Sequence, residues 1–326
     1  MREAKMIFDT DHALERRQMR RKLSIWRIVA ILSLILLVAV AGYSVVANSP
    51  DLKRNSPHIA KLTIDGVILG EQRKLDLIRK LEQSDAVKGV ILSVNSPGGS
   101  TSGGEAMYEA LSKLAKKKPL VTSMDGIATS AGYMVSLPAE RIFARRSTIT
   151  GSIGVIFQYT DVTKLMNTVG VEMRAIKSTP LKAEPNPFSK RNPEAEAMIQ
   201  RMIDDSYQWF VDLVANRRPF DRETTLKLAD GRVVTGGQAV ELQLVDELGG
   251  PETAKDWLIK QHDLSADLKV IEWKPAPLRD DLPFGLASKF LSKWVPAPLF
   301  DLIDTRKQVG KLDGLVSVWQ AQKSEQ

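Results

Sequence analysis

The apolar positions change their spacing in a regular order over the first half of the chain. Residues 58–68 (HIAKLTIDGVI) have the β-branched character of a strand, whereas apolar side chains recur on one helical face of residues 71–84. Residues 87–97 are a mostly apolar run, typical of a strand that is covered on both faces, and residues 103–117 return to helical spacing. Repeated units of this kind predict an α/β fold with largely parallel strands.

The pattern continues with shorter elements. Further strands are predicted over residues 119–125, 141–144 and 148–157. A short helix is predicted directly after Ser130, and a proline-rich loop, residues 178–193, leads into a long helix from about residue 194 to 215. Two short helices around a turn are predicted within residues 221–250.

Near the N-terminus lies a long uncharged stretch, residues 28–47 (IVAILSLILLVAVAGYSVVA). At about 1.5 Å rise per residue, a helix of this length matches a hydrocarbon core of roughly 30 Å, which predicts a transmembrane anchor. A cleaved signal peptide is the alternative, because Val45 and Ala47 suit a small-residue cleavage pattern, although an apolar run of about 7 to 15 residues is usual there. Eight Lys or Arg residues precede the stretch, which predicts a cytoplasmic N-terminus and an exported remainder.

Composition narrows the choice of chemistry. The chain has 326 residues, of which 43% are hydrophobic and 26% charged, as is ordinary for a globular fold. Its net charge of +7 is partly concentrated before residue 28, so the basic balance does not argue for nucleic acid. Because cysteine is absent, thiol nucleophiles, disulfides and cysteine-based metal sites are excluded.

These observations divide the chain into five expected parts. They are a basic cytoplasmic N-terminus (1–27), a transmembrane anchor (28–47), a linker (48–57), an exported domain (58–273) and a C-terminal arm (274–326). This C-terminal segment, residues 274–326, is rich in proline and contains apolar clusters. Two interpretations of it stay open: a segment that covers the domain, and a contact with the membrane surface or with another subunit.

Two segments rich in small residues follow predicted strands. In the first, NSPGGS (residues 95–100), the glycines Gly98 and Gly99 allow close approach of backbone N–H groups to a ligand or a developing oxyanion, but the segment taken alone favours a tight strand-to-helix turn. In the second, Ser130 stands at the start of a predicted helix, with the N–H of Ala131 next to it. Such a serine is either a helix N-cap or a nucleophile.

A nucleophilic serine needs a base, and the histidines do not supply an obvious one. The chain has three of them, His12, His58 and His262. None has the neighbours of a dedicated partner. A neutral lysine can accept the proton where its surroundings lower a lysine pKa from its usual value of about 10.4. Residue chemistry alone does not choose among Lys177, Lys182 and Lys190.

Five ordered motifs carry a resemblance to a known family. They are VNSPGGS, IATSAGYM, TITGSIGVI, AIKSTPLKAEPNPF and ADGRVVTGGQAVELQLVDELGG. Together with the single N-terminal span, they resemble the signal peptide peptidase A family, peptidase family S49, within the Clp protease and crotonase superfamily. The resemblance covers residues 58–260. It implies an α/β fold of repeated ββα units that is preceded in the sequence by one transmembrane helix.

The resemblance also implies a serine–lysine dyad. The family nucleophile falls on Ser130 and its general base on Lys182. The family serine that orients the lysine amine falls on Ser152. The oxyanion donors fall on the backbone N–H of Gly98 or, preferably, Gly99, and on that of Ala131. Ala131 stands where the family often has glycine, and Thr179 and Pro180 depart from the family pattern in the lysine loop.

For the whole molecule, the resemblance implies a serine endopeptidase of the bacterial inner membrane, with its catalytic domain in the periplasm. Its substrates would be cleaved signal peptides and other small unfolded peptides, and no metal or other cofactor is required. Short members of the family form a homo-oligomeric ring, thought to be an octamer, with each dyad shared between adjacent protomers. Two alternatives stay open: a crotonase-like acyl-thioester enzyme, and an inactive membrane scaffold of the same fold.

Overall fold

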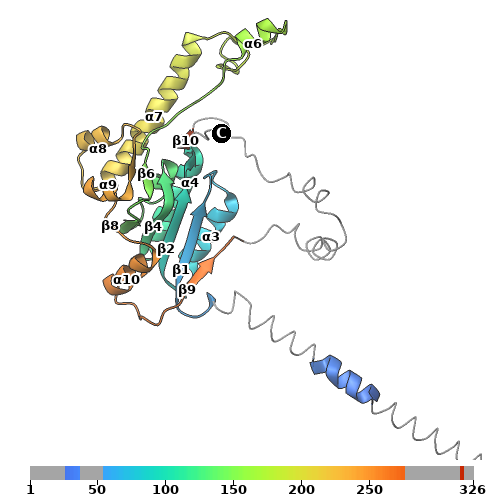
Figure 1. The fold of residues 1–326 in the computed structure, drawn as a ribbon, viewed down its shortest axis with the longest axis vertical. Helices are drawn as coiled ribbons and strands as arrows, with labels where there is room; N and C mark the ends of the chain where they lie inside the picture. Colours follow the sequence, from blue (N-terminus) through green and yellow to red (C-terminus); the bar gives the residue numbers. More distant parts are fainter. Residues whose placement is uncertain (1–25, 37–53, 276–315, 319–326) are drawn as a thin grey trace, which may run out of the picture. The chain divides into compact units, whose positions relative to one another are not determined.

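The computed structural model describes residues 26–36, 54–275 and 316–318, in two units that divide after Ser56 (Figure 1). The first unit contains a helix over residues 26–36, whose side chains are all exposed. In these three ranges, no helix combines the length and the apolarity that crossing a membrane requires. The predicted anchor, residues 28–47, lies partly outside them. All that follows concerns the second unit.

An eight-stranded sheet forms the centre of this unit, with the order β7-β6-β4-β2-β1-β9 and with β5 and β8 branching from β4. Its strands are β1 (His58–Asp65), β2 (Val87–Ser96), β4 (Leu120–Thr129), β5 (Arg141–Ala144), β6 (Ile149–Gly151), β7 (Val233–Thr235), β8 (Glu247–Leu248) and β9 (Val270–Trp273). All neighbours are parallel except β6 and β7. The predicted α/β class with a largely parallel sheet is confirmed.

The helices follow the strands closely in sequence. They are α3 (Gln72–Gln83), α4 (Thr101–Ala115), α5 (Ala131–Met134), α6 (Thr163–Thr168), α7 (Pro193–Arg217), α8 (Arg222–Leu228), α9 (Gly236–Glu241) and α10 (Pro251–Gln261). The helices predicted over residues 71–84 and 194–215 correspond to α3 and α7. The two short helices predicted within residues 221–250 are α8 and α9, on either side of β7.

The sheet is buried on both faces, as the apolar runs predict. Ile59 and Ile91 pack against Leu258 of α10 on one face. Their neighbours Ala60 and Leu92 point to the other face and belong to the large core cluster that includes the buried residues of α3 and α4. Because successive side chains of a strand point in opposite directions, both sets must be apolar when helices cover both faces.

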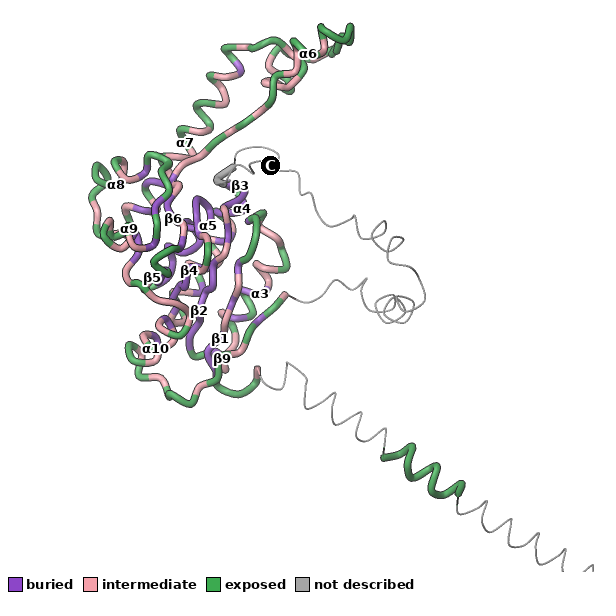
Figure 2. The backbone as a smooth tube through the Cα atoms, viewed as in Figure 1, coloured by how far each residue is buried: buried purple, intermediate pink, exposed green. Residues whose placement is uncertain are grey.

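Helix α7 is divided between the core and a projection. Its C-terminal half buries Phe210, Val211 and Val214, whereas Met202, nearer the N-terminal end, is 48% exposed. Residues 155–192, which we call the arm, contain α6 and connect β6 to the start of α7. Figures 1 and 2 show the arm at the end of α7 that lies away from the sheet, with mostly exposed or half-buried residues. One end of the helix is thus anchored in the core while the other carries the arm.

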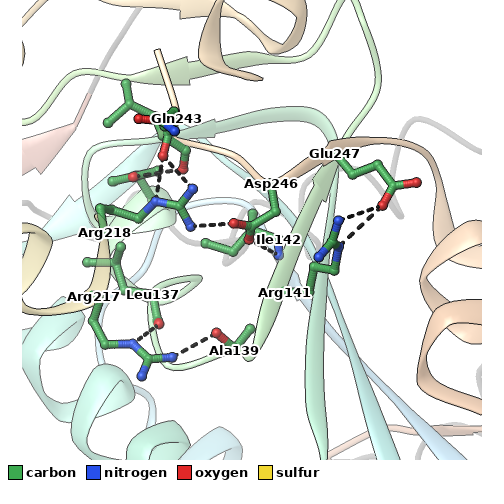
Figure 3. A network of polar contacts seen from close by, with 11 residues as sticks. Leu137, Ala139, Arg141, Ile142, Arg217, Arg218, Gln243, Asp246 and Glu247 are labelled. Carbon is green, nitrogen blue, oxygen red and sulfur yellow. Dashed lines mark hydrogen bonds and ion pairs between the residues drawn. The ribbon is translucent and has the colours of Figure 1, made fainter. Parts of the chain in front are cut away.

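Polar contacts hold the C-terminal end of α7 on the core (Figure 3). Arg217 donates a 2.6 Å hydrogen bond from Nε to the carbonyl of Leu137, in the turn that follows α5. Arg218 forms a 3.0 Å ion pair with Asp246, whose other carboxylate oxygen accepts a 2.7 Å hydrogen bond from the N–H of Ile142 at β5. The C-terminal end of α7 is therefore hydrogen-bonded to the turn that follows α5.

The structure corrects the predicted strand boundaries in two places. The strand predicted through residues 148–157 ends at Gly151, because the backbone of Ser152 turns with a φ of 52° and the chain then leaves the sheet. The strand predicted over residues 58–68 ends at Asp65, because Gly66 turns with a φ of 72°. A β3 strand (Gly98–Ser100) that pairs with β10 (Val316–Val318) was not predicted.

We expect Phe210→Ala to lower the free energy of unfolding by about 3 to 5 kcal/mol, because it leaves a cavity where α7 is anchored. Met202→Ala on the same helix is the matched control and should change it by less than about 0.5 kcal/mol. Denaturant unfolding of the two variants beside the parent chain measures the difference. Equal effects would show that α7 is not anchored through its C-terminal half.

Candidate active site

The carboxyl ends of three parallel strands bring the predicted site segments together. In the register between β2 and β4, Ser96 pairs with Ala128, and in that between β4 and β6, Thr129 pairs with Gly151. The Thr129 hydroxyl also donates a 3.0 Å hydrogen bond to the carbonyl of Pro97. The segments that follow these strands, with Gly98, Ser130 and Ser152, therefore share one end of the sheet.

Ser130 occupies a sharp turn between β4 and α5. Its φ of 56° and ψ of −118° lie in a sparsely populated region for a residue other than glycine, at a cost of about 1 to 3 kcal/mol. Its N–H donates a 2.9 Å hydrogen bond to the carbonyl of Gly151, and its own carbonyl accepts one of 2.9 Å from the N–H of Met134. A serine on a strained strand-to-helix turn is the backbone arrangement of a nucleophile elbow.

The helix-cap interpretation of Ser130 receives no support from the side chain. Ser130 stands at the N-cap position of α5, but its side chain makes no capping hydrogen bond. The residue is buried within the chain, with 1% of its surface exposed. The backbone turn, rather than capping, is therefore what distinguishes this serine.

The small residues after Ser130 permit close packing of α5. A Cβ at Gly132 would lie 2.8 Å from the carbonyl oxygen of Ser96, and one at Gly104 of α4 would lie 3.1 Å from the Cβ of Ala131. Tyr133 is fully buried, donates a 2.9 Å hydrogen bond to the carbonyl of Leu244, and has its pKa raised by burial. The absence of a side chain at Gly132 and Gly104 thus allows α5 to pack closely against β2 and α4.

The two glycines of the NSPGGS segment differ in what their backbone groups contact. The N–H of Gly98 donates a 3.1 Å hydrogen bond to the Ser96 hydroxyl, and its carbonyl accepts one of 2.9 Å from Ile68. The N–H of Ser100 donates a 3.0 Å hydrogen bond to the carbonyl of Ile68. Since backbone groups alternate along a strand, the N–H and carbonyl of Gly99 face the opposite edge of β3.

Gly99 is also required by the close approach of two backbones. A Cβ at this position would lie 1.8 Å from the carbonyl oxygen of Ile68, far inside contact distance. The glycine pair in the sequence predicted only that some other group comes close to this backbone. The partner, the bridge between Ile68 and Gly99, comes from the tertiary structure.

Ser152 follows the strand that pairs with the end of β4. Its N–H donates a 2.7 Å hydrogen bond to the carbonyl of Arg232, and its φ of 52° turns the chain out of the sheet. Because Thr129 pairs with Gly151, Ser130 and Ser152 come directly after paired positions of neighbouring strands. The structure therefore brings these two serines to the same end of the sheet.

Lys182 lies apart from this cluster. It is an exposed residue of the arm, between α6 and α7, and its backbone N–H donates a 3.1 Å hydrogen bond to the carbonyl of Thr179. In the described part of the chain, its amine has no hydrogen-bond or ion-pair partner. The arm, which contains Lys182, lies at the end of α7 away from the sheet, whereas Ser130 directly follows β4 (Figure 1).

A second lysine of the arm has a structural role. The Lys177 amine contacts a Glu184 carboxylate oxygen at 2.5 Å, and the Ser189 hydroxyl donates a 2.6 Å hydrogen bond to the other oxygen. Two hydrogen bonds hold the pKa of Glu184 below its usual range: the one from Lys177 has the larger effect, and the one from Ser189 adds to it. Lys177 therefore stabilises the arm. The third candidate lysine, Lys190, is an exposed residue further along the arm.

The described histidines lie outside the cluster that contains Ser130. His58 begins β1 and accepts a 2.9 Å hydrogen bond from the indole of Trp273. His262 directly follows α10 and contacts Glu140, which precedes β5, at 2.9 Å. His12 lies outside the described residues. Within those residues, no group of three or more His, Asp or Glu side chains is placed to hold a metal ion.

Comparison with known proteins identifies relatives over much of this domain. Residues 112–265 match peptidase family S49. A protein of Enterococcus faecium with the provisional name signal peptide peptidase SppA is 38% identical over 230 residues, which are 66% of this chain and 67% of that protein. A protein of Synechocystis with the provisional name protease slr0021 is 36% identical over 225 residues, which cover 68% of this chain and 80% of the relative.

The same comparison includes proteins of which the chain matches a smaller share. A provisionally named protease of Methanocaldococcus jannaschii is 40% identical over 180 residues, or 55% of this chain and 58% of the relative. Protease 4 of Salmonella typhi is 33% identical over 246 residues, which are 72% of this chain and 39% of the relative. The matched part of the chain thus spans less than two thirds of these two proteins.

We expect Gly99→Ala to displace β3 from Ile68 and to lower the free energy of unfolding by about 1 to 3 kcal/mol. Gly126→Ala is the matched control: among the described residues, the only heavy atom within 4 Å of its new Cβ is Asn95 Oδ1, at 3.4 Å, so its effect should be small. Thermal unfolding of both variants measures the difference. If Gly99→Ala is tolerated as well as Gly126→Ala, the close approach of the two backbones does not constrain the site.

Proposed function

Because the chain belongs to peptidase family S49, a family of serine proteases, we propose that it is a membrane-anchored serine endopeptidase with a Ser130–Lys182 dyad. The observation that carries the proposal is the strained turn at Ser130, which stands with Ser152 and Gly99 at one end of a parallel sheet. We assign the fold to the Clp protease and crotonase class of repeated ββα units. Parallel strands alternating with α3 and α4 support that assignment.

The proposed reaction is acyl transfer to serine followed by hydrolysis. Ser130 Oγ attacks a peptide carbonyl carbon while the neutral amine of Lys182 accepts the hydroxyl proton. Collapse of the tetrahedral intermediate breaks the carbon–nitrogen bond, and Lys182 returns the proton to the departing amine. Water then attacks the ester with the lysine again as base, which releases the acid and restores Ser130. The Ser152 hydroxyl would orient the lysine amine.

Backbone N–H groups would hold the oxyanion of both intermediates. We assign this role to Ala131, which follows the nucleophile, and to Gly99. Gly99 is preferred to Gly98 because the N–H of Gly98 already donates to the Ser96 hydroxyl, whereas that of Gly99 faces away from Ile68. Since both donors are backbone groups, alanine in place of glycine at position 131 leaves the donor intact.

We propose that the two members of each dyad come from adjacent protomers of a homo-oligomeric ring and that this ring is an octamer. The support is that Lys182 is exposed on the arm while Ser130 is buried at the end of the sheet. The arm also exposes large apolar side chains, which is typical of a surface that another protein covers. They include Leu165, Val169, Val171, Met173 and Ile176. A neighbouring domain that covers Lys182 would favour the neutral amine that the reaction needs.

We place the enzyme in the bacterial inner membrane, anchored by residues 28–47, with a cytoplasmic N-terminus and a periplasmic domain. The uncharged run and the basic residues before it support this orientation. The proposed substrates are cleaved signal peptides and other small unfolded peptides. The provisional name of the Enterococcus relative, signal peptide peptidase, favours this class.

The dyad is tested with single and paired variants. Ser130→Ala and Lys182→Ala should each abolish hydrolysis of a fluorogenic peptide, because one removes the nucleophile and the other its base. Lys190→Ala, a lysine of the same arm, is the control and should retain activity. Coexpression of the Ser130→Ala and Lys182→Ala chains should restore about a quarter of the active sites if each dyad spans two protomers that mix at random.

Each outcome separates the alternatives. Full activity of either single variant would contradict the dyad, and failure of the mixed variants to regain activity would contradict sharing between protomers. A crotonase-like thioester enzyme would not need Ser130 for its reaction, so an active-site serine reagent should not label it. An inactive scaffold would hydrolyse no peptide in the parent form.

A further inference from the structure

Thr129, the residue directly before Ser130, has a hydroxyl that the proposed reaction does not use. The side chain is fully buried, and its hydroxyl donates a 3.0 Å hydrogen bond to the carbonyl of Pro97. In the register between β2 and β4, Ser96 lies opposite Ala128, so Pro97 and Thr129 each follow one member of a pair. One hydroxyl therefore joins the end of β4 to the turn between β2 and β3.

This hydrogen bond holds one end of a peptide group. The carbonyl of Pro97 and the N–H of Gly98 belong to the same planar peptide and point in opposite directions. The carbonyl accepts its hydrogen bond from Thr129, while the N–H donates one of 3.1 Å to the Ser96 hydroxyl. Because both ends of the group have a partner, the plane of this peptide is fixed.

The fixed plane in turn directs the next peptide group, which contains the N–H of Gly99. The two groups are joined through the α carbon of Gly98, whose φ of 112° is a backbone conformation that favours glycine. The carbonyl of Gly98 accepts a 2.9 Å hydrogen bond from the N–H of Ile68. The N–H of Gly99 belongs to the same planar group and points away from that carbonyl. Hydrogen bonds on two successive peptide groups thus determine its direction.

We propose that Thr129 is a positioning residue of the active site, and that its hydroxyl sets the direction of the Gly99 N–H relative to Ser130. The inference rests on the proposed function, because it takes that N–H as an oxyanion donor. Thr129 is linked to the nucleophile through the backbone and to the donor turn through its side chain. It therefore connects the two parts of the site that must be held at a fixed separation.

The connection matters in the transition state more than in substrate binding. Donors that already point at the position of the oxyanion stabilise it without reorganising, and a displacement of about 1 Å in an active site can cost about 100-fold in rate. The oxyanion forms only after Ser130 has attacked the substrate. Loss of the Thr129 hydroxyl is therefore expected to lower kcat and to leave KM nearly unchanged.

The first experiment removes the hydroxyl and then restores it. Thr129→Val keeps the branched shape of the side chain but has no donor for the Pro97 carbonyl. It should lower kcat for a fluorogenic peptide by about tenfold or more, with KM changed by less than about twofold. Thr129→Ser retains a hydroxyl and should return kcat to within about threefold of the parent value.

Thr150→Val is the matched control. Thr150 of β6 is also fully buried, and its hydroxyl donates a 2.7 Å hydrogen bond to a backbone carbonyl, that of Ala128. The substitution removes a comparable hydrogen bond at the same end of the sheet without touching the turn between β2 and β3. It should change kcat by less than about twofold. Equal losses of kcat in the two valine variants, or an unchanged kcat in Thr129→Val, would overturn the proposal.

The second experiment does not depend on hydrolysis. Amide hydrogen exchange of the full-length chains in detergent is followed by mass spectrometry on fragments that contain residues 95–104. Exchange in these fragments should be faster in Thr129→Val than in the parent, and unchanged in Thr150→Val. Unchanged exchange in Thr129→Val would overturn the proposal. Faster exchange, together with a parent that hydrolyses no peptide, would support the link between Thr129 and the turn and contradict the proposed function instead.

Discussion

The hydrogen bond from the N–H of Ser130 to the carbonyl of Gly151, 2.9 Å long, holds the turn on which the candidate site depends. Strand β4 pairs with β5 over Val121–Met124 and with β6 over Ile127–Thr129, so its end is drawn to a different neighbour from its start. The chain must then reverse at once into α5. The unfavourable φ of Ser130 persists because the surrounding backbone and the fully buried α5 leave no alternative path.

The same end of the sheet combines rigid and open parts. Helix α5 is fixed by close contacts at Gly132 and by the buried hydroxyl of Tyr133, and β3 is fixed on one side by Ile68. The other side of β3 is an edge that accepts a strand, and β10 lies on it. A preorganised backbone suits the binding of a developing oxyanion, because its donors need not reorganise when charge appears.

The arm shows how one helix serves two purposes. The Phe210 end of α7 is buried, and Arg217 and Arg218 tie it to the segments around α5 and β5. The other end carries the loop with Lys182 away from the sheet. Lys182 is exposed on the arm and Ser130 is buried after β4, which is why we propose that each dyad is shared between neighbouring protomers. The apolar side chains exposed on the arm are consistent with that proposal.

Much of the fold was predictable because its signals are local. The helical spacing of residues 71–84 and the apolar run at 87–97 correspond to α3 and β2, since both faces of the sheet are covered. The strand boundaries at Gly151 and Asp65 were not predictable, because apolar residues continue past both turns. The pairing of β3 with Ile68 and with β10 joins residues that are far apart in sequence, so no local sequence pattern predicts it.

The sequence by itself determined the α/β class, the order of the main elements and the candidate residues. Hydrophobic periodicity and motifs are formed by residues that are close together in the sequence, so they can be recognised without the structure. The sequence left Ser130 between an N-cap and a nucleophile, and Gly98 beside Gly99. Tertiary structure decided that the serine stands in a strained turn and that the N–H of Gly98 donates to Ser96, while Gly99 faces the edge of β3 on which β10 lies. These differences depend on which backbone groups meet across the sheet, and only the folded chain brings those groups together.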